Sequence, residues 1–219
     1  MIQSAPLPQA PATPTPWDAR LAGWLVRPLL GTWVRPNHLT FLRLVVGLAG
    51  VGFIAAGGYA FVNIGMLLVV LSNFLDHTDG ALARMGGLGS HFGHLFDLAS
   101  DALVTVLLFV ALGMALPAGS DFGGYAELCG LVAGIAVAAI FFMRMRIEER
   151  AGKAGTKQPQ FAGFEIEDVL YLLPLVSLFD VPGPFILAAG LVAPLFALWV
   201  LRDWLRVCVR HPAGADSRS

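Results

Sequence analysis

The sequence predicts an all-α integral membrane protein, with six transmembrane helices preceded by an amphipathic helix on the membrane surface. Of its 219 residues, 57% are hydrophobic and only 13% are charged, whereas soluble domains carry about 25% charged residues. Six apolar runs approach or exceed the length needed to cross a bilayer, which takes about 20 helical residues. A segment with regularly spaced tryptophans and leucines precedes the first run.

The N-terminal region divides into a tail and a surface helix. Residues 1–16 contain five prolines and no Lys or Arg, which predicts an extended, disordered tail and not a cleavable signal peptide. Residues 17–34 follow as the interfacial helix, because apolar residues recur there at helical spacing with arginines between them. These residues are Trp17, Leu21, Trp24, Leu25 and Leu29, with Arg20 and Arg27.

The apolar runs define a single membrane domain over residues 17–210, followed by a flexible tail over residues 211–219. The fifth run is short, begins with acidic residues, and contains Pro174, which is expected to kink it. No polar stretch is long enough to form a separate soluble domain. The expected spans cover about residues 39–57, 60–84, 91–116, 124–146, 165–180 and 183–206.

Positive charge is confined to one side of this arrangement. All 14 Lys and Arg residues flank the spans on the same side, and the three opposite connections, near residues 57–60, 116–125 and 180–184, contain none. Lys and Arg near membrane spans favour the cytoplasmic side. Both termini are therefore expected in the cytoplasm.

Four aspartates lie near the cytoplasmic ends of the second and third spans. Asp76 and Asp79 are three residues apart, and Asp97 and Asp101 are four apart, so each pair shares one face of its helix. The connection between the spans is short and rich in glycine, which allows the two helices to be antiparallel neighbours. The two pairs are therefore expected to converge into one cluster of carboxylates.

Such a cluster needs a source of positive charge. A charged side chain at the membrane centre costs at least about 2.5 kcal/mol, and oxygen ligands suit hard ions such as Mg2+ and Mn2+. Four carboxylates can hold two ions about 3.5–4 Å apart, a spacing used for displacement at phosphorus. Gly80 and Ala83 leave room for a substrate, and Arg84 offers a guanidinium to phosphate. These residues favour a phospholipid precursor as substrate.

Two other interpretations of the aspartates are open. Aspartates in membrane proteins also form hydrogen bonds between helices, although four at these spacings, with glycines and an arginine, argue against that role. Carboxylates can also line a path for cations or protons, which gives no reason for Arg84. Ion flux in vesicles without nucleotide dependence would distinguish such a transporter from an enzyme.

The same residues carry a resemblance to a known family. The pattern D-x2-D-G-x2-A-R-x8-G-x3-D-x3-D resembles the signature of the CDP-alcohol phosphatidyltransferases at all eight fixed positions. They are Asp76, Asp79, Gly80, Ala83, Arg84, Gly93, Asp97 and Asp101. The predicted spans, the surface helix and the sequence RPNHLT before the first span also resemble that family.

The resemblance implies a reaction and its participants. A phosphatidyl (phosphoalcohol) group would pass from a CDP-linked membrane lipid, normally CDP-diacylglycerol, to the hydroxyl of a small alcohol, with release of CMP. The catalytic domain would be the membrane domain, its active site would face the cytoplasm, and the enzyme would be a homodimer. No nucleic-acid partner is expected.

The resemblance also implies roles for individual residues. Asp76, Asp79 and Asp97 would bind two divalent cations, Mg2+ or Mn2+, with Asp101 sharing one of them. Asp101 would also be the catalytic general base that takes the proton of the acceptor. The CDP-lipid would be contacted by Gly80, Ala83, Arg84, Ser90 and Gly93, and by Asn37 and Thr40. The signature requires nothing of the nearby histidines, which are His77, His91 and His94.

The acceptor alcohol is less well specified. Arg144 and Arg146 lie at the cytoplasmic end of the fourth span and favour a phosphorylated polyol, such as inositol phosphate or glycerol phosphate. Alternatively, these arginines only follow the positive-inside rule and contact anionic lipid. An amino-alcohol acceptor of the serine or choline type also stays open, because acidic residues start the fifth span. They are Glu165, Glu167 and Asp168.

Overall fold

The computed structural model of the protein describes residues 17–116, 123–151, 171 and 173–210. The described residues form helices and connections without any strand, which confirms the all-α class. The tails predicted over residues 1–16 and 211–219 lie outside this part of the chain.

Five helices are long and apolar enough to cross a membrane, and the protein is an integral membrane protein. Their bounds agree with the first four predicted spans and the last one to within five residues. They are α2 (Pro36–Ala56), α3 (Tyr59–Gly86), α4 (His91–Met114), α5 (Gly123–Ala151) and α7 (Pro182–Arg210).

The fifth predicted span is described only in part, as α6 (Leu173–Leu178), so the count of six spans stays a prediction. Pro174 is the second residue of α6. The missing N–H of a proline in the first turn breaks no helical hydrogen bond. The expected kink at Pro174 is therefore not seen within α6.

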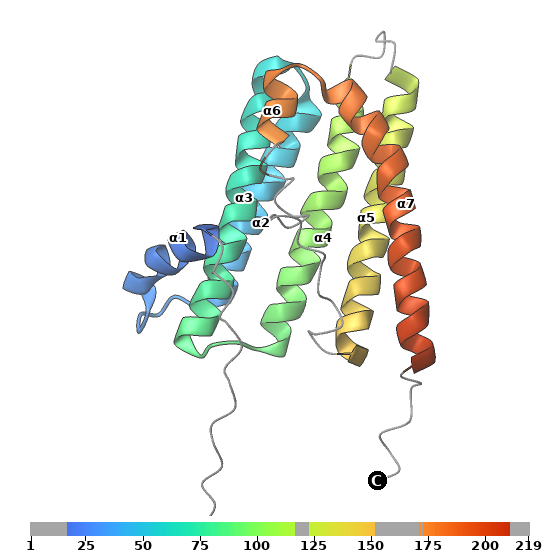
Figure 1. Ribbon diagram of the computed structural model, residues 1–219. Helices are drawn as coiled ribbons and strands as arrows, with labels where there is room; N and C mark the ends of the chain where they lie inside the picture. The colour runs from blue at the N-terminus through green and yellow to red at the C-terminus, as the bar shows by residue number, and fades with distance from the viewer. Residues whose placement is uncertain (1–16, 117–122, 152–170, 172, 211–219) are drawn as a thin grey trace, which may run out of the picture.

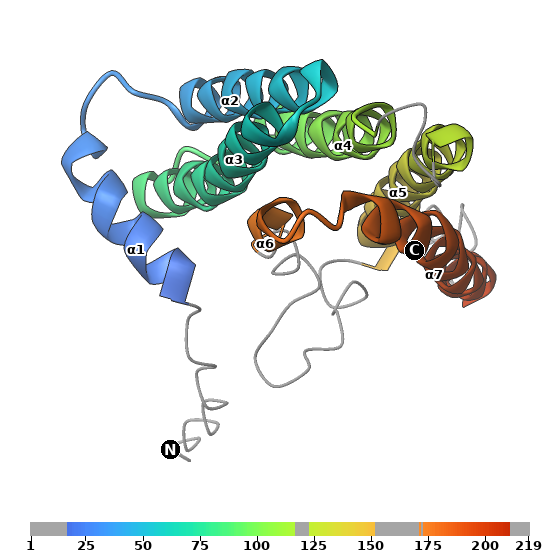
Figure 2. The same cartoon turned by 90° about the horizontal axis from the view of Figure 1, so that it is seen from above.

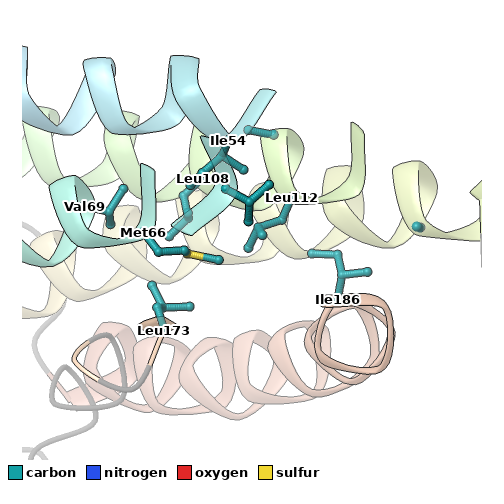
Figure 3. Packing of buried hydrophobic residues seen from close by; sticks show 10 residues of the cluster. Ile54, Met66, Val69, Leu108, Leu112, Leu173 and Ile186 are labelled. Carbon is teal, nitrogen blue, oxygen red and sulfur yellow. The ribbon is translucent and has the colours of Figure 1, made fainter. Parts of the chain in front are cut away.

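The helices form two packed groups (Figures 1 and 2). One group contains α2, α3 and α4, the other contains α5 and α7, and α4 packs along α5 to join them. Figure 3 shows the apolar cluster at the junction, to which α2, α3, α4, α6 and α7 contribute Ile54, Met66, Leu112, Leu173 and Ile186. In lipid, such contacts stabilise the bundle through close packing.

The surface helix α1 (Trp17–Val26) lies across the bundle beside α3 (Figures 1 and 2). It is shorter than expected: a 3-10 turn, η1 (Arg27–Leu29), follows it, and Gly31 then takes a left-handed backbone conformation with φ 77°. Ala22 and Val26 are buried in a cluster with residues of α3, whereas Trp24 is 66% exposed. The large apolar side chain of Trp24 is thus left to the membrane surface, while small residues contact the bundle.

Glycines allow α2 and α3 to approach closely. A Cβ atom at Gly65 of α3 would lie 2.5 Å from the carbonyl oxygen of Gly50 in α2, and another at Gly50 would lie 2.8 Å from the carbonyl oxygen of Gly65. Small residues at such crossings are typical of membrane helices, since they let backbones come into contact. The close approach matters for the site, because α2 and α3 both contribute to it.

Gly65→Ala is expected to lower the free energy of unfolding by about 1–3 kcal/mol, because the added methyl meets backbone and forces the helices apart. Thermal unfolding in detergent measures the effect. Gly52→Ala is the matched control, since a Cβ at Gly52 meets no atom within 4 Å. Equal melting temperatures of the two variants would contradict the close packing of α2 and α3.

Candidate active site

A tight turn between α3 and α4 brings the two aspartate pairs to the same end of the bundle. Gly87, with φ 62°, is the left-handed residue that ends α3, a conformation that glycine adopts at little cost. Ser90 caps α4, and its Oγ accepts a hydrogen bond of 3.0 Å from the backbone N–H of Gly93. The chain thus reverses direction within a few residues.

The structure brings three of the four predicted carboxylates into one group. Asp76, Asp97 and Asp101 each offer an oxygen, and these oxygens lie within 4.8 Å of one another. Asp79 is outside this group: it is 4% exposed, and its Oδ2 accepts a hydrogen bond of 2.7 Å from Thr40 Oγ1. Thr40, predicted to contact the lipid donor, therefore has an aspartate as its partner.

Sequence reasoning missed Arg43, which lies among the carboxylates. It was counted with the arginines that flank the first span, yet it is 2% exposed. Its guanidinium forms ion pairs with Asp76 at 3.1 Å, Asp79 at 3.4 Å and Asp101 at 2.5 Å, and also with Asp97. The signal was its position three residues after Thr40, on the same face of α2 and already inside an apolar run.

The two-helix picture of the site therefore needs a correction. The sequence indicated that the helices now identified as α3 and α4 converge on each other. In the structure, α2 packs along both α3 and α4 and places Arg43 between their aspartates. A third helix was missed because sequence spacing shows which residues share a face, but not which helix covers that face.

A groove of about 380 Å³ opens beside the cluster, between the start of α2, the end of α3 and the start of α4. It gathers all seven residues predicted to contact the CDP-lipid, together with Asp79, Asp97 and His94. The seven are Asn37, Thr40, Gly80, Ala83, Arg84, Ser90 and Gly93.

Two glycines of the groove make room for polar side chains. A Cβ at Gly93 would lie 2.9 Å from Asn37 Oδ1 and 3.0 Å from Ser90 Oγ, and a Cβ at Gly80 would lie 3.1 Å from Arg84 Nη1. The absent side chain at position 80 thus lets the Arg84 guanidinium fold back along α3. The glycines of the signature shape the groove through their neighbours.

A smaller cavity of about 50 Å³ also adjoins the cluster. Asp76, Asp101, Asn73 and Thr105 are among the residues that line it. Within the described part of the chain, the buried atoms Asn73 Nδ2 and Asp76 Oδ1 make no hydrogen bond, although Asp76 Oδ1 is ion-paired with Arg43. A carboxylate oxygen without a hydrogen bond, beside two further carboxylates, fits a hard divalent cation.

The arginines predicted to bind the acceptor lie on α5, each beside an aromatic ring. The Arg144 guanidinium carbon is 5.8 Å from the centre of the Phe196 ring, and that of Arg146 is 5.2 Å from the centre of the Phe142 ring. Among the described residues that line the groove and the cavity, neither arginine appears.

The fold and the site together define an integral membrane protein in which buried and partly buried acidic residues lie beside a groove. The chain belongs to the CDP-alcohol phosphatidyltransferase family, whose sequence model matches residues 33–205.

Three known proteins are similar to this chain in sequence. The chain is 31% identical over 167 residues to the bifunctional IPC transferase and DIPP synthase of Rubrobacter xylanophilus, a match covering 74% of this chain and 35% of that protein. It is 34% identical over 119 residues to cholinephosphotransferase 1 of Danio rerio, covering 50% of this chain and 30% of that protein. For CDP-diacylglycerol–inositol 3-phosphatidyltransferase of Candida albicans the identity is 29% over 82 residues, with 37% and 34% covered.

The chain spans about a third of the length of these curated relatives. Among solved structures, it is similar to Mycobacterium tuberculosis phosphatidylinositol phosphate synthase (PgsA1) with CDP-DAG bound. The TM-score is 0.62 at 22% identity, over 91% of this chain and 99% of that one. This likeness confirms the fold.

Proposed function

We propose that this protein transfers a phosphatidyl group from a CDP-diacylglycerol-type lipid to the hydroxyl of a small alcohol and releases CMP. The observation that carries the proposal is the groove beside the carboxylates, which is lined by every residue that the family resemblance implies for the donor. Its volume of about 380 Å³ falls within the range of small-molecule sites, roughly 300–1,000 Å³.

The donor would lie with its diphosphate in this groove. Arg84 offers several N–H donors to phosphate oxygens, and Ser90 and Asn37 add polar atoms around it. The groove lies at the membrane end where α3 turns into α4, so the acyl chains can stay in the bilayer while the nucleotide is bound.

The donor set supports binding of divalent cations, Mg2+ or Mn2+. Asp76, Asp97 and Asp101 would hold them, with Asp79 nearby. When bound, such ions neutralise the charge on the phosphoryl oxygens during displacement. Two of the carboxylates, those of Asp97 and Asp79, line the wall of the groove.

Asp101 is the proposed general base. It lines the smaller cavity together with Asp76. A carboxylate in this position would take the proton of the acceptor hydroxyl at one of its oxygens.

A phosphorylated polyol is the proposed acceptor. The Mycobacterium tuberculosis enzyme is named for phosphatidylinositol phosphate, which supports this choice, whereas the relative from Candida albicans is named for inositol, a polyol without a phosphate. Arg144 and Arg146 are the candidate phosphate ligands. The similarity to a cholinephosphotransferase favours the alternative, an amino alcohol.

The orientation and assembly are also proposals. The start of α2 and the ends of α3, α5 and α7 lie at one end of the bundle (Figure 1), and this end carries Arg35, Arg84, Arg150 and Arg206. The positive-inside rule then places the site and both termini in the cytoplasm. We infer a homodimer of a single membrane catalytic domain, residues 17–210, with tails over residues 1–16 and 211–219.

The purified protein, incubated with labelled CDP-diacylglycerol and a panel of alcohols, tests the reaction. We expect CMP release that needs Mg2+ or Mn2+ and is abolished by a chelator, with a phosphorylated polyol in the labelled lipid product. A labelled amino-alcohol lipid would replace the acceptor assignment and keep the reaction. Absence of metal-dependent CMP with every alcohol would contradict the proposed function.

A further inference from the structure

Arg43 stands at the centre of the carboxylate cluster, and the reaction proposed above gives it no role. Two turns into α2, it contacts all four aspartates, and its Nη2 also donates to the backbone carbonyl of Asp97 at 2.8 Å.

The position of Arg43 differs from that of an arginine that receives substrate. Asp79 and Asp97 line the groove, whereas Asp76 and Asp101 line the smaller cavity. Arg43 is absent from the described linings of both spaces. Its side chain is 3% exposed and is paired with carboxylates that line both spaces.

Neighbouring residues hold the backbone of α2 at this point. Ser72 Oγ of α3 donates a hydrogen bond of 2.8 Å to the carbonyl oxygen of Arg43. One turn further along α2, a Cβ at Gly47 would lie 2.8 Å from the same Ser72 Oγ. The close fit of α2 against α3 thus determines the depth at which the guanidinium sits.

Arg43 contacts the same carboxylates that a metal ion would use. Arg43 contacts Oδ1 of Asp76, Asp97 and Asp101, the three carboxylates that converge into one group. One guanidinium offsets one of four negative charges, and a divalent cation entering the group would meet both occupied oxygens and a positive charge.

We propose that Arg43 is an internal counter-ion of the carboxylate cluster, which holds the aspartates together in the metal-free protein and competes with a divalent cation for their oxygens. This inference rests on the proposed function, because it requires that a divalent cation binds there. It gives Arg43 a positioning role that opposes tight metal binding.

The sign of the effect on metal affinity separates this role from a merely structural one. If Arg43 competes, removing its charge lowers the repulsion felt by the incoming cation at short range, and the metal binds more tightly. If Arg43 only shapes the site, removing it lets the carboxylates move apart, and the metal binds more weakly.

The experiment compares Mn2+ binding, measured by electron paramagnetic resonance, in full-length wild-type protein and Arg43→Gln. We expect the Kd of the variant to fall about tenfold or more. We also expect the melting temperature of the metal-free variant to drop by about 10 °C, because one buried and three partly buried carboxylates lose their partner, and saturating Mn2+ to recover most of this loss. Arg27→Gln, which removes an exposed arginine in η1, should leave both values unchanged.

A folded Arg43→Gln protein that binds Mn2+ equally or more weakly overturns the inference and leaves the proposed function intact. If Arg43→Gln does not fold, Arg43→Lys decides: its single ammonium should give a Kd severalfold below that of the wild type, and an equal or higher Kd overturns the inference. The metal site itself would be overturned by a different result: wild-type protein that binds no Mn2+, or binds it in a way that Asp97→Asn does not weaken.

Discussion

Asp101→Asn is expected to slow CMP release from CDP-diacylglycerol by about 10³-fold or more. Asparagine keeps the size of the side chain and an oxygen that can accept from Arg43 Nη1, which lies 2.5 Å from Asp101 Oδ1, so the fold should persist. It cannot take a proton, and general-base catalysis is worth about 10²–10⁴-fold. The loss of a ligand charge from the cluster adds to the effect.

Initial rates at saturating Mg2+ or Mn2+ measure this loss, with thermal unfolding as a check on folding. Asp203→Asn is the matched control, because Asp203 is an aspartate of α7 that pairs with the exposed Arg206 at 3.4 Å. The control should keep the wild-type rate. An Asp101→Asn enzyme with more than a tenth of that rate would exclude Asp101 as the base.

Arg84→Ala is expected to raise KM for the CDP-lipid by about 10- to 100-fold, with a smaller effect on kcat. Arg84 lines the groove, and Gly80 leaves space for its guanidinium beside α3. Hydrogen bonds to charged groups contribute about 1.5–3 kcal/mol, and each 1.4 kcal/mol corresponds to tenfold in affinity. Arg84→Lys should restore part of the loss, since an ammonium keeps the charge without the fork.

Steady-state kinetics with varied CDP-diacylglycerol give the two constants, and Mn2+ binding is measured alongside. Arg27→Ala, which removes another exposed arginine from the same end of the bundle, is the control and should leave KM unchanged. Loss of Mn2+ affinity in Arg84→Ala would show that Arg84 supports the carboxylates and not the donor.

The spans could be predicted because their signal is local. A continuous apolar run must satisfy its backbone hydrogen bonds within itself when it lies in lipid, and this requires a helix. The predicted spans 60–84 and 91–116 therefore match α3 and α4 closely. The surface helix was overextended beyond Val26, because its apolar period continues through Leu29 while Pro28 and Gly31 change the backbone.

The groove was also largely predictable, because its residues come from short stretches of sequence that must lie together. Gly80, Ala83 and Arg84 follow one another on α3, and Ser90 and Gly93 come directly after the turn. Ser90, Gly93, Asn37 and Thr40 were named as donor contacts only through the family resemblance, and Asn37 and Thr40 lie on another helix, which nothing local connects with the turn.

By itself, the sequence determined that this is a membrane-embedded, all-α protein whose aspartates, spaced three and four residues apart, form two helical faces at one membrane end. Those conclusions depend on helical periodicity and on the cost of charge in lipid, which act within each segment. Only the tertiary structure decided that α2 covers both faces, that Thr40 binds Asp79, and that Arg43 lies among the carboxylates. Helix packing decides such contacts. Arg43 lies inside an apolar run and can pair only with side chains on helices that pack against α2, and the small residues of α2 determine which helices come close.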